Sequence, residues 1–388
     1  MRRRPTVLFY CQHSLGLGHL VRSFALAAGL AERFRVVLLN GGPMPRGIDR
    51  PAGVEIVSLA PLGMDTDGIL VSRDGRRSVA RALELRRATI LSTLVQLQPD
   101  VIFIELFPFG RKKFGGELIA MLDAARASAS PPLVVSSLRD ILVSKRRDQA
   151  GHDERASTLS NAYFDLILVH ADPSFATLEE SFRPRTPLEV PVRYTGFVLP
   201  GADGTTFREH HPPPSPRVVV SAGGGLYGEP LLSTAVAAHP RLSMEGIAMT
   251  VVAGPFLPEA SFKALQAAAR GRAGLTVLRS VKDLCGELSR ASASVSQCGY
   301  NTVLDVLRAG VPALVVPFAE GREDEQTRRA ARLERLGALQ VLESRRLTAP
   351  RFAKAVQEVL TFHPAPVNVD VDGARTTAAI LAEMRGLT

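Results

Sequence analysis

The chain contains no tryptophan, only three cysteines and no long apolar run among its 388 residues. Without tryptophan, no indole can serve as a stacking platform for a ligand. The cysteines (Cys11, Cys285 and Cys298) include no C-x-x-C pair, so we expect neither a disulfide framework nor a zinc site. No segment approaches the roughly 18 consecutive apolar residues that a transmembrane helix needs.

The composition is that of an ordinary globular protein, with 46% hydrophobic and 22% charged residues. A disordered or fibrous chain is therefore excluded, and the length predicts two to three domains. The start, Met-Arg-Arg-Arg-Pro, imitates the basic end of a signal peptide, but the apolar run Val7 to Cys11 is too short to continue it. We therefore expect a cytoplasmic protein.

The formal net charge is +9, and basic residues cluster at Arg2–Arg4, Arg111–Lys113 and Lys145–Arg147. These clusters fit either a solvated surface or attraction to an anionic partner. Such a partner would be a phosphorylated acceptor or an acidic membrane leaflet, with the protein peripheral at the inner face of the membrane. Nucleic acid is not expected, because no binding motif and no interleaved aromatic residues accompany the basic ones.

Short, continuous runs of Val, Ile and Leu alternate with longer amphipathic stretches, a pattern typical of parallel strands buried on both faces. The predicted strands are Thr6–Tyr10, Arg35–Leu39, Val54–Leu59, Val101–Glu105, Leu133–Ser136, Leu166–Val169, Val192–Thr195, Arg217–Ser221, Met249–Ala253, Thr276–Leu278, Ala293–Ser296, Ala313–Pro317 and Leu339–Leu342. Helices such as Leu20–Arg33, Ser78–Leu97 and Glu117–Ala127 lie between them. The alternation predicts doubly wound α/β sheets.

Residues 199–216 are rich in glycine and proline and interrupt the alternation, which is typical of an interdomain linker. We predict a Rossmann-like domain over 1–198, a second one over 217–365, and a last helix over 372–388 that packs back on the first domain. Two-domain folds of this class place their main site in the cleft between the domains, at the carboxyl ends of the strands.

Two strand-to-helix junctions stand out. The first carries Gly18, His19 and Arg22, with His19 at the start of a helix, where the imidazolium form is disfavoured. A neutral imidazole suits a general base, although the residues alone also allow a capping histidine. The second junction runs from Ser221 through Gly223, Gly224 and Gly225, whose amides are able to approach a phosphate or simply form a turn.

A third junction, Ser296 to Gln326, combines more features. Gly299, Asn301 and Thr302 open a helix, and Glu325 and Gln326 start another. Asp305, one turn into the first of these helices, either reaches a ribose diol or is simply a carboxylate on the helix face. Glu105, Arg139 and Asp140 lie at strand ends of the first domain, where they either line an acceptor side or face solvent.

The third junction resembles the donor-nucleotide signature of GT-B glycosyltransferases of family 28, which includes the peptidoglycan N-acetylglucosaminyltransferase and the plant galactolipid synthases. The resemblance implies an inverting transferase that uses a nucleotide sugar, with UDP favoured, and needs neither a cofactor nor a metal. It also implies that Asp305 holds the ribose, Gln326 binds sugar hydroxyls, the backbone of Val281 contacts uracil, and His19 is the base.

The chain departs from the peptidoglycan enzyme in a first loop with fewer glycines and in Glu325, where that enzyme has a second glutamine. These departures leave the acceptor and the sugar open. A nucleotide-sugar hydrolase or epimerase on the same fold and a non-catalytic nucleotide-sugar-binding protein remain alternatives. An NAD(P)-dependent oxidoreductase is disfavoured, because no loop fits G-x-G-x-x-G with an acidic residue about 20 positions later.

Overall fold

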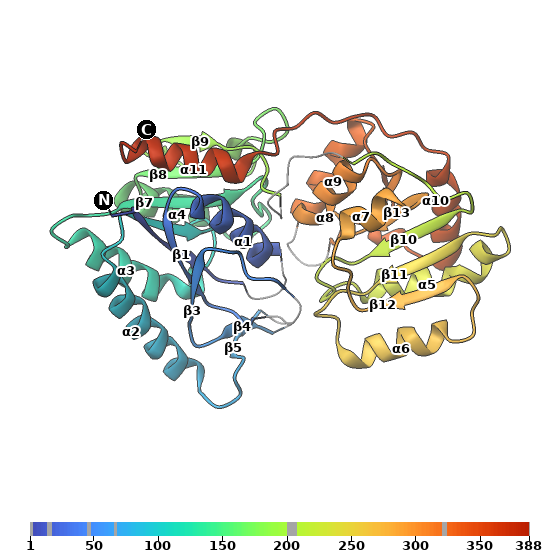
Figure 1. Cartoon of the computed structure of the whole chain (residues 1–388), viewed down its shortest axis with the longest axis horizontal. Coiled ribbons are helices and arrows are strands. Elements are labelled where there is room, and N and C mark those ends of the chain that lie inside the picture. The colour runs from blue at the N-terminus through green and yellow to red at the C-terminus, as the bar shows by residue number, and fades with distance from the viewer. Residues whose placement is uncertain are drawn as a thin grey trace. The chain divides into compact units, whose positions relative to one another are not determined.

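The computed structural model describes residues 3–13, 18–44, 48–65, 68–199, 208–319 and 324–387. The chain forms two compact units, unit 1 from residues 1–205 with 369–388 and unit 2 from residues 206–368. In each unit, helices cover both faces of a parallel sheet (Figure 1). Unit 1 is therefore built from both ends of the sequence.

The sheet of unit 1 has seven strands in the order β3-β2-β1-β6-β7-β8-β9, and each neighbouring pair is parallel. Its strands are β1 (Thr6–Cys11), β2 (Arg35–Asn40), β3 (Val54–Ser58), β6 (Val101–Glu105), β7 (Leu133–Arg139), β8 (Leu166–His170) and β9 (Val192–Tyr194). Strands β1, β6 and β8 are buried along their whole length, which explains their continuous apolar sequence. The predicted parallel sheet is confirmed.

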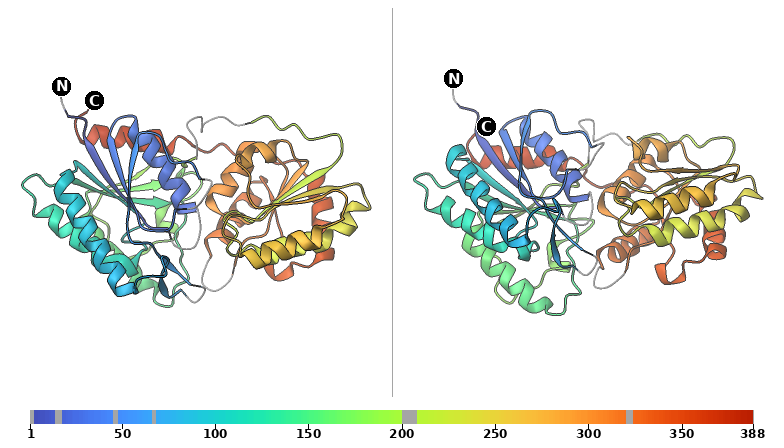
Figure 2. Two further views of the ribbon diagram at one scale, coloured as in Figure 1. Left: turned by 60° about the horizontal axis from the view of Figure 1, so that its bottom comes forward. Right: turned by 90° about the horizontal axis from the view of Figure 1, so that it is seen from below.

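Helices α1 (Gly18–Ala31) and α11 (Gly373–Met384) cover one face of this sheet, and α2 (Val79–Leu97), α3 (Gly115–Arg126) and α4 (Gln149–Tyr163) cover the other (Figure 2). Apolar side chains of α1 and α11 share a core with β1, β2 and β6. The helix α11 approaches closely at Gly373, where a Cβ atom would lie 2.5 Å from the Gly196 carbonyl oxygen. Only glycine allows this contact between distant parts of the chain.

The sheet of unit 2 has the order β12-β11-β10-β13-β14-β15 and is also parallel. Its strands are β10 (Arg217–Ser221), β11 (Ala248–Val252), β12 (Leu275–Leu278), β13 (Ala293–Ser296), β14 (Ala313–Val315) and β15 (Gln340–Val341). Helices α5 (Glu229–Ser243), α6 (Glu259–Ala269) and α10 (Ala349–Leu360) pack on one face. Helices α7 (Leu284–Ser289), α8 (Tyr300–Ala309) and α9 (Glu325–Arg335) lie on the other (Figures 1 and 2).

Several element bounds differ from those predicted. Strand β14 ends at Val315 instead of Pro317, because proline has no N–H to continue the ladder. The edge strand β15 is only two residues long, whereas β7 continues to Arg139. A small antiparallel pair, β4 (Leu62–Met64) and β5 (Leu70–Ser72), was not expected, since three-residue strands carry no readable periodicity.

Each sheet reverses its strand order at one place. In unit 1 the chain runs outward from β1 to β2 and β3, and then continues on the opposite side of β1 with β6. In unit 2 the same reversal lies between β10 and β13. Open α/β sheets bind their ligands beyond the carboxyl ends of the strands at such a switch point. Ligand sites are therefore expected at the two switch points.

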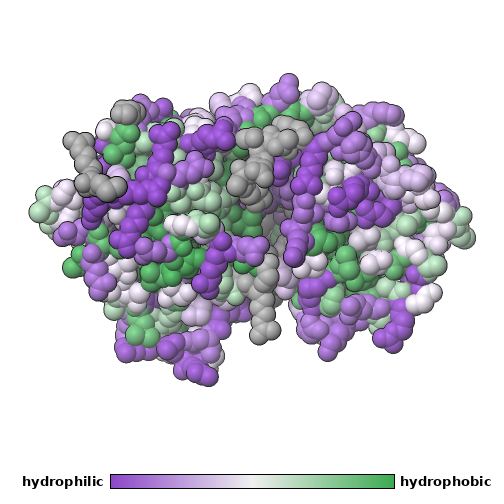
Figure 3. All heavy atoms as spheres, in the orientation of Figure 1, coloured by the Kyte–Doolittle hydropathy of each residue, from purple (hydrophilic) through white to green (hydrophobic). Residues whose placement is uncertain are grey.

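The described helices include none with the length and apolar character needed to cross a membrane. On the face drawn in Figure 3, hydrophilic residues predominate in both units, and the apolar ones form smaller patches among them.

Candidate active site

The switch point of unit 1 brings a histidine and a carboxylate together. His19 lies in the first turn of α1, after β1, and Glu105 is the last residue of the neighbouring strand β6. The His19 Nδ1 atom lies 2.6 Å from the Glu105 Oε1 atom, a hydrogen-bond distance. The His19 side chain is 22% exposed, so it is accessible from outside while Glu105 is fully buried.

Two arginines hold the Glu105 carboxylate in place. Arg22, one turn further along α1 and only 2% exposed, donates from Nη2 to Oε1 at 2.6 Å. Arg111 donates to the other oxygen, Oε2, from Nη2 at 2.7 Å and from Nε at 3.1 Å. A buried carboxylate requires such partners, since an unpaired charge in the interior is strongly destabilising. Glu105 therefore does not face solvent, one of the two options left open by the sequence.

The charges around this pair fix its protonation. Burial by itself would raise the pKa of Glu105, but Arg111, His19 and Arg22 together hold it well below the usual range. Burial lowers the pKa of His19 to about 3, with Glu105 opposing the shift and Arg111 adding to it. His19 is thus neutral at physiological pH, and burial is the main cause. A neutral His19 donates its Nδ1–H to Glu105 and leaves Nε2 as a proton acceptor.

The other predicted acceptor-side residues lie at the same edge of the sheet. Gly18 is the exposed first residue of α1, and residues 14–17 of the preceding loop lie outside the described part of the chain. Arg139 ends β7, and its charge also acts to lower the pKa of His19. Asp140 follows it and is 1% exposed, so it does not face solvent.

In unit 2, the switch point places Ser221 and Ser296 opposite each other at the ends of β10 and β13. The glycine-rich loop after Ser221 turns through left-handed backbone at Gly223 and Gly225, with φ of 57° and 89°. The Gly223 N–H donates to Ser221 Oγ (3.3 Å) and the Gly225 N–H to the Ala222 carbonyl (3.0 Å). These two amides thus have partners within the loop, so the turn that the sequence offered beside phosphate binding is present, and phosphate binding stays a prediction.

Helix α8 begins directly beyond Ser296. Gly299 is its N-cap, and a Cβ atom added there would meet open space. Thr302 lies against the glycine loop: a Cβ atom added to Gly223 would lie 3.2 Å from the Thr302 Oγ1 atom. The neighbouring Asn301 is half-buried. Ser296 is 2% exposed, and its hydroxyl has no hydrogen-bond partner among the described residues. Such a buried, unsatisfied hydroxyl next to a helix N-terminus suits an oxygen-rich ligand.

Helix α9 fixes the loop that leads into α8. The Gln326 Oε1 atom accepts hydrogen bonds from the backbone N–H groups of Cys298 (3.0 Å) and Phe318 (3.1 Å). Arg329, one turn later, donates to the Cys298 carbonyl at 2.7 Å. Gln326 therefore braces two loops, a role that its sequence position did not reveal, and its binding of sugar hydroxyls stays a prediction. Glu325, the first residue of α9, is buried.

The other two predicted donor residues, Asp305 and Val281, lie in different elements of unit 2. Asp305 is half-buried in α8, and Val281 is half-buried in the loop after β12. Burial raises the pKa of Asp305 to about 7, with Arg308 opposing the shift and Asp283 adding to it. Asp305 is consequently a carboxyl group that changes charge near neutral pH.

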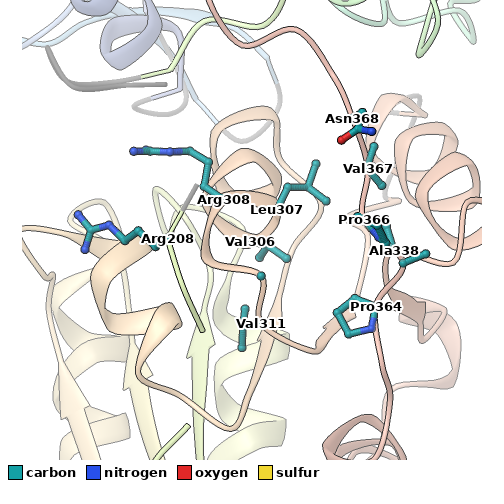
Figure 4. Close-up of a pocket in the computed structure, with 12 residues that line it drawn as sticks. Arg208, Val306, Leu307, Arg308, Val311, Ala338, Pro364, Pro366, Val367 and Asn368 are labelled. Carbon is teal, nitrogen blue, oxygen red and sulfur yellow. The ribbon is translucent and has the colours of Figure 1, made fainter. Parts of the chain in front are cut away.

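A separate cavity of about 380 Å³ lies in unit 2 at the other end of α8. Figure 4 shows Val306, Leu307 and Val311 on one side and the segment from Pro364 to Asn368 on the other, with the Arg208 and Arg308 side chains extending away from that segment. Its described lining includes none of the predicted donor residues, and the cavity is distinct from the switch point.

Sequence reasoning missed several buried polar groups near the site. Arg86 and Glu117 form a fully buried ion pair at 2.6 Å, joined by Tyr10, whose hydroxyl donates to Glu117. At the end of β8, His170 contacts the Ser137 hydroxyl at 2.8 Å. Arg111 was noted only as part of a basic cluster. The partners in these contacts are tens of residues apart in the sequence, so no local spacing pattern predicts them. His170 is the exception, because a histidine at the end of an apolar strand is recognisable from the sequence.

The chain is similar in sequence to known glycosyltransferases. Residues 265–376 match the glycosyltransferase family 28 C-terminal domain. The chain is 25% identical over 366 residues to a UDP-N-acetylglucosamine–N-acetylmuramyl-(pentapeptide) pyrophosphoryl-undecaprenol N-acetylglucosamine transferase of Phenylobacterium zucineum, with 93% of this chain and 91% of the relative covered.

Solved structures show the fold. MurG of Acinetobacter baumannii superposes with a TM-score of 0.60 at 16% identity, covering 98% of this chain and 100% of that one. A putative UDP-N-acetylglucosamine 2-epimerase of Listeria monocytogenes gives 0.62 at 13% identity, covering 99% and 96%. The predicted architecture is thus confirmed: the chain has the GT-B fold, and its residues 265–376 resemble the C-terminal domain of glycosyltransferase family 28.

Proposed function

We propose that this protein transfers a sugar from a UDP-sugar to a hydroxyl group of an acceptor, with inversion at the anomeric carbon and without a metal ion. The observation that carries the proposal is the His19–Glu105 pair, held by Arg22 and Arg111 at the switch point of unit 1. A binding protein without catalysis has no need for a histidine positioned by a buried carboxylate.

Unit 1 supplies the base. Neutral His19 accepts the acceptor's hydroxyl proton at Nε2 as the hydroxyl oxygen forms a bond to the anomeric carbon. The bond from that carbon to the diphosphate oxygen breaks on the opposite face, which inverts the configuration. Glu105, 2.6 Å from Nδ1, stabilises the imidazolium that forms, and it keeps the proton-accepting nitrogen turned outward.

Unit 2 supplies the groups that hold the donor. The N-terminus of α8, the hydroxyl of Ser296 and the N–H group of Gly224 would stabilise negative charge on the leaving diphosphate. Fixed dipoles of this kind do the work of a divalent cation. Asp305 would accept hydrogen bonds from the ribose hydroxyls, and Val281 would contact the base.

Calorimetric titration with UDP, dTDP, GDP and NADH, all in chelator, tests the donor site. We expect selective binding of UDP, and Asp305→Ala should weaken it by about 1.5–3 kcal/mol, the range for a hydrogen bond to a charged group. Binding of NADH alone, or unchanged UDP affinity in the variant, would contradict this assignment. Activity measurements test the reaction itself. Sugar transfer that strictly requires Mg²⁺ or Mn²⁺ would overturn the metal-independent mechanism. Turnover of the donor without an acceptor would indicate a hydrolase or an epimerase.

The affinity for UDP should rise with pH through neutrality. Asp305 has a pKa of about 7, and hydrogen bonds from the ribose hydroxyls favour its ionised form. Ionisation changes from about one tenth to nine tenths between pH 6 and pH 8, so the dissociation constant should fall by up to about tenfold. Asp305→Asn is the control, because any pH dependence left in that variant belongs to the nucleotide.

The sequence does not identify the acceptor, but the positive charges near His19 favour an anionic one. Lys145 and Arg147 are exposed in the loop after β7, beside the edge that carries His19. The Phenylobacterium relative is named for a lipid-linked diphosphate acceptor. We therefore propose an acceptor with phosphate groups and peripheral contact with an anionic membrane surface at its cytoplasmic face.

A further inference from the structure

We propose that Arg111 is a positioning residue, which locks the Glu105 carboxylate and through it the orientation of the His19 imidazole. This inference rests on the proposed role of His19 as the base. Nothing in the motif that carries the family resemblance includes Arg111.

The geometry around the carboxylate gives Arg111 a task that Arg22 does not perform. Arg22 and His19 both contact Oε1 at 2.6 Å, whereas Arg111 contacts Oε2 through two nitrogens, at 2.7 and 3.1 Å. A carboxylate held at only one oxygen is able to rotate about its Cγ–Cδ bond. With Oε2 fixed as well, Oε1 stays aimed at the imidazole.

The loop that carries Arg111 is built to hold it there. Both Leu106 and Arg111 have left-handed backbone, with φ of 64° and 60°, which non-glycine residues adopt at a cost in free energy. The loop is pinned by the Leu106 N–H to the Ser137 carbonyl (2.9 Å), the Ser136 hydroxyl to the Phe107 carbonyl (2.8 Å) and the Gly110 N–H to the Leu106 carbonyl (2.6 Å). Arg111 itself is 11% exposed, so it is turned inward from the basic cluster to which the sequence assigned it.

Among the charged groups, Glu105, Arg111 and Arg139 act on His19, and Arg111, His19 and Arg22 act on Glu105. Two more histidines share these charges: Arg111 and Glu105 act on His13, and Arg22 and Glu105 act on His170. Arg111 opposes protonation of His19, so its removal should raise the pKa of this histidine. Glu105 would then be held at one oxygen only.

The test is Arg111→Gly in the full-length protein. Glycine adopts the left-handed backbone without strain, so the substitution removes the guanidinium while favouring the loop conformation. Lys112→Ala removes one positive charge from the adjacent, exposed position and serves as the matched control. Arg111→Lys keeps the charge but offers a single nitrogen, and thermal unfolding confirms that each variant is folded.

The readout is NMR of protein with isotopically labelled histidine, with the His19 signal assigned from a His19→Gln variant. We expect His19 to carry its proton on Nδ1 in the wild type and in Lys112→Ala. In Arg111→Gly its titration midpoint should move up by about one pH unit or more, with both tautomers populated. In Arg111→Lys the positive charge is kept, so the titration midpoint of His19 should return close to its wild-type value. Both tautomers should remain populated, because a single nitrogen holds Oε2 less firmly than two.

An unchanged tautomer and midpoint in folded Arg111→Gly would overturn the positioning role, whatever reaction the protein catalyses. The NMR comparison needs no substrate, so it stands apart from the proposed function, which is tested by His19 itself. With an acceptor in hand, Arg111→Gly should lower kcat and leave the KM for the donor unchanged, whereas a change in KM alone would contradict the proposal.

Discussion

Replacing His19 with alanine is expected to lower turnover by about 10²–10⁴-fold, the contribution of a positioned general base. The affinity for the donor nucleotide should be unchanged, because the groups proposed to hold the nucleotide belong to unit 2 while His19 belongs to unit 1. The Nε2 atom is the only part of the His19–Glu105 pair able to accept a proton from the acceptor, since Nδ1 is bound to the carboxylate. Steady-state rates together with calorimetric UDP binding check both halves of this expectation.

His363, an exposed histidine of unit 2, provides the control, and His363→Ala should retain full turnover. Near-wild-type turnover of His19→Ala would show that His19 only caps the helix, the second option that its sequence position allows. Loss of nucleotide binding in the same variant would show instead that the substitution disturbs the fold.

The variant Glu105→Gln is expected to lose about 10²–10⁴-fold in turnover as well, for a different reason. The amide either donates to or accepts from Nδ1, so it no longer selects one tautomer, and it carries no charge to stabilise the imidazolium. The substitution also leaves Arg22 and Arg111 buried without a counter-charge, which should lower the free energy of unfolding by about 3–5 kcal/mol. Chemical denaturation and kcat on the folded fraction separate the two effects.

Glu117→Gln is the matched control for this experiment. Glu117 is also a buried glutamate, paired with the fully buried Arg86 at 2.6 Å, but it does not contact His19. We expect a loss of stability similar to that of Glu105→Gln with turnover per folded molecule retained. Equal losses of turnover in both variants would show that the effect of Glu105→Gln comes from the fold and not from the chemistry.

Local sequence patterns were enough to predict the architecture. Continuous apolar runs such as Val101–Glu105 mark strands buried on both faces, and the amphipathic stretches between them fit the helices. The motif from Ser296 to Gln326 pointed to the part of the chain that matches the family 28 C-terminal domain, because its glycine, polar and acidic residues follow one another along the chain. His19 was also recognisable, since its distance from the preceding strand is a local property.

The environment of these residues was not predictable in the same way. Glu105 was placed at a strand end, but its contacts with His19, Arg22 and Arg111 depend on β6 pairing with β1, which are about 90 residues apart in sequence. Gln326 was assigned to a sugar, and yet its amide oxygen braces two loops. Arg111 looked like one more surface cation.

The sequence alone therefore determined the fold class, the switch-point loops and the residue types available there, because these follow from periodicity and short-range spacing. Only the tertiary structure decided which charges meet and how deeply they are buried. Burial and the pairing of distant side chains set the protonation of Glu105, His19 and Asp305, and both arise only when strands far apart in sequence become neighbours in a sheet.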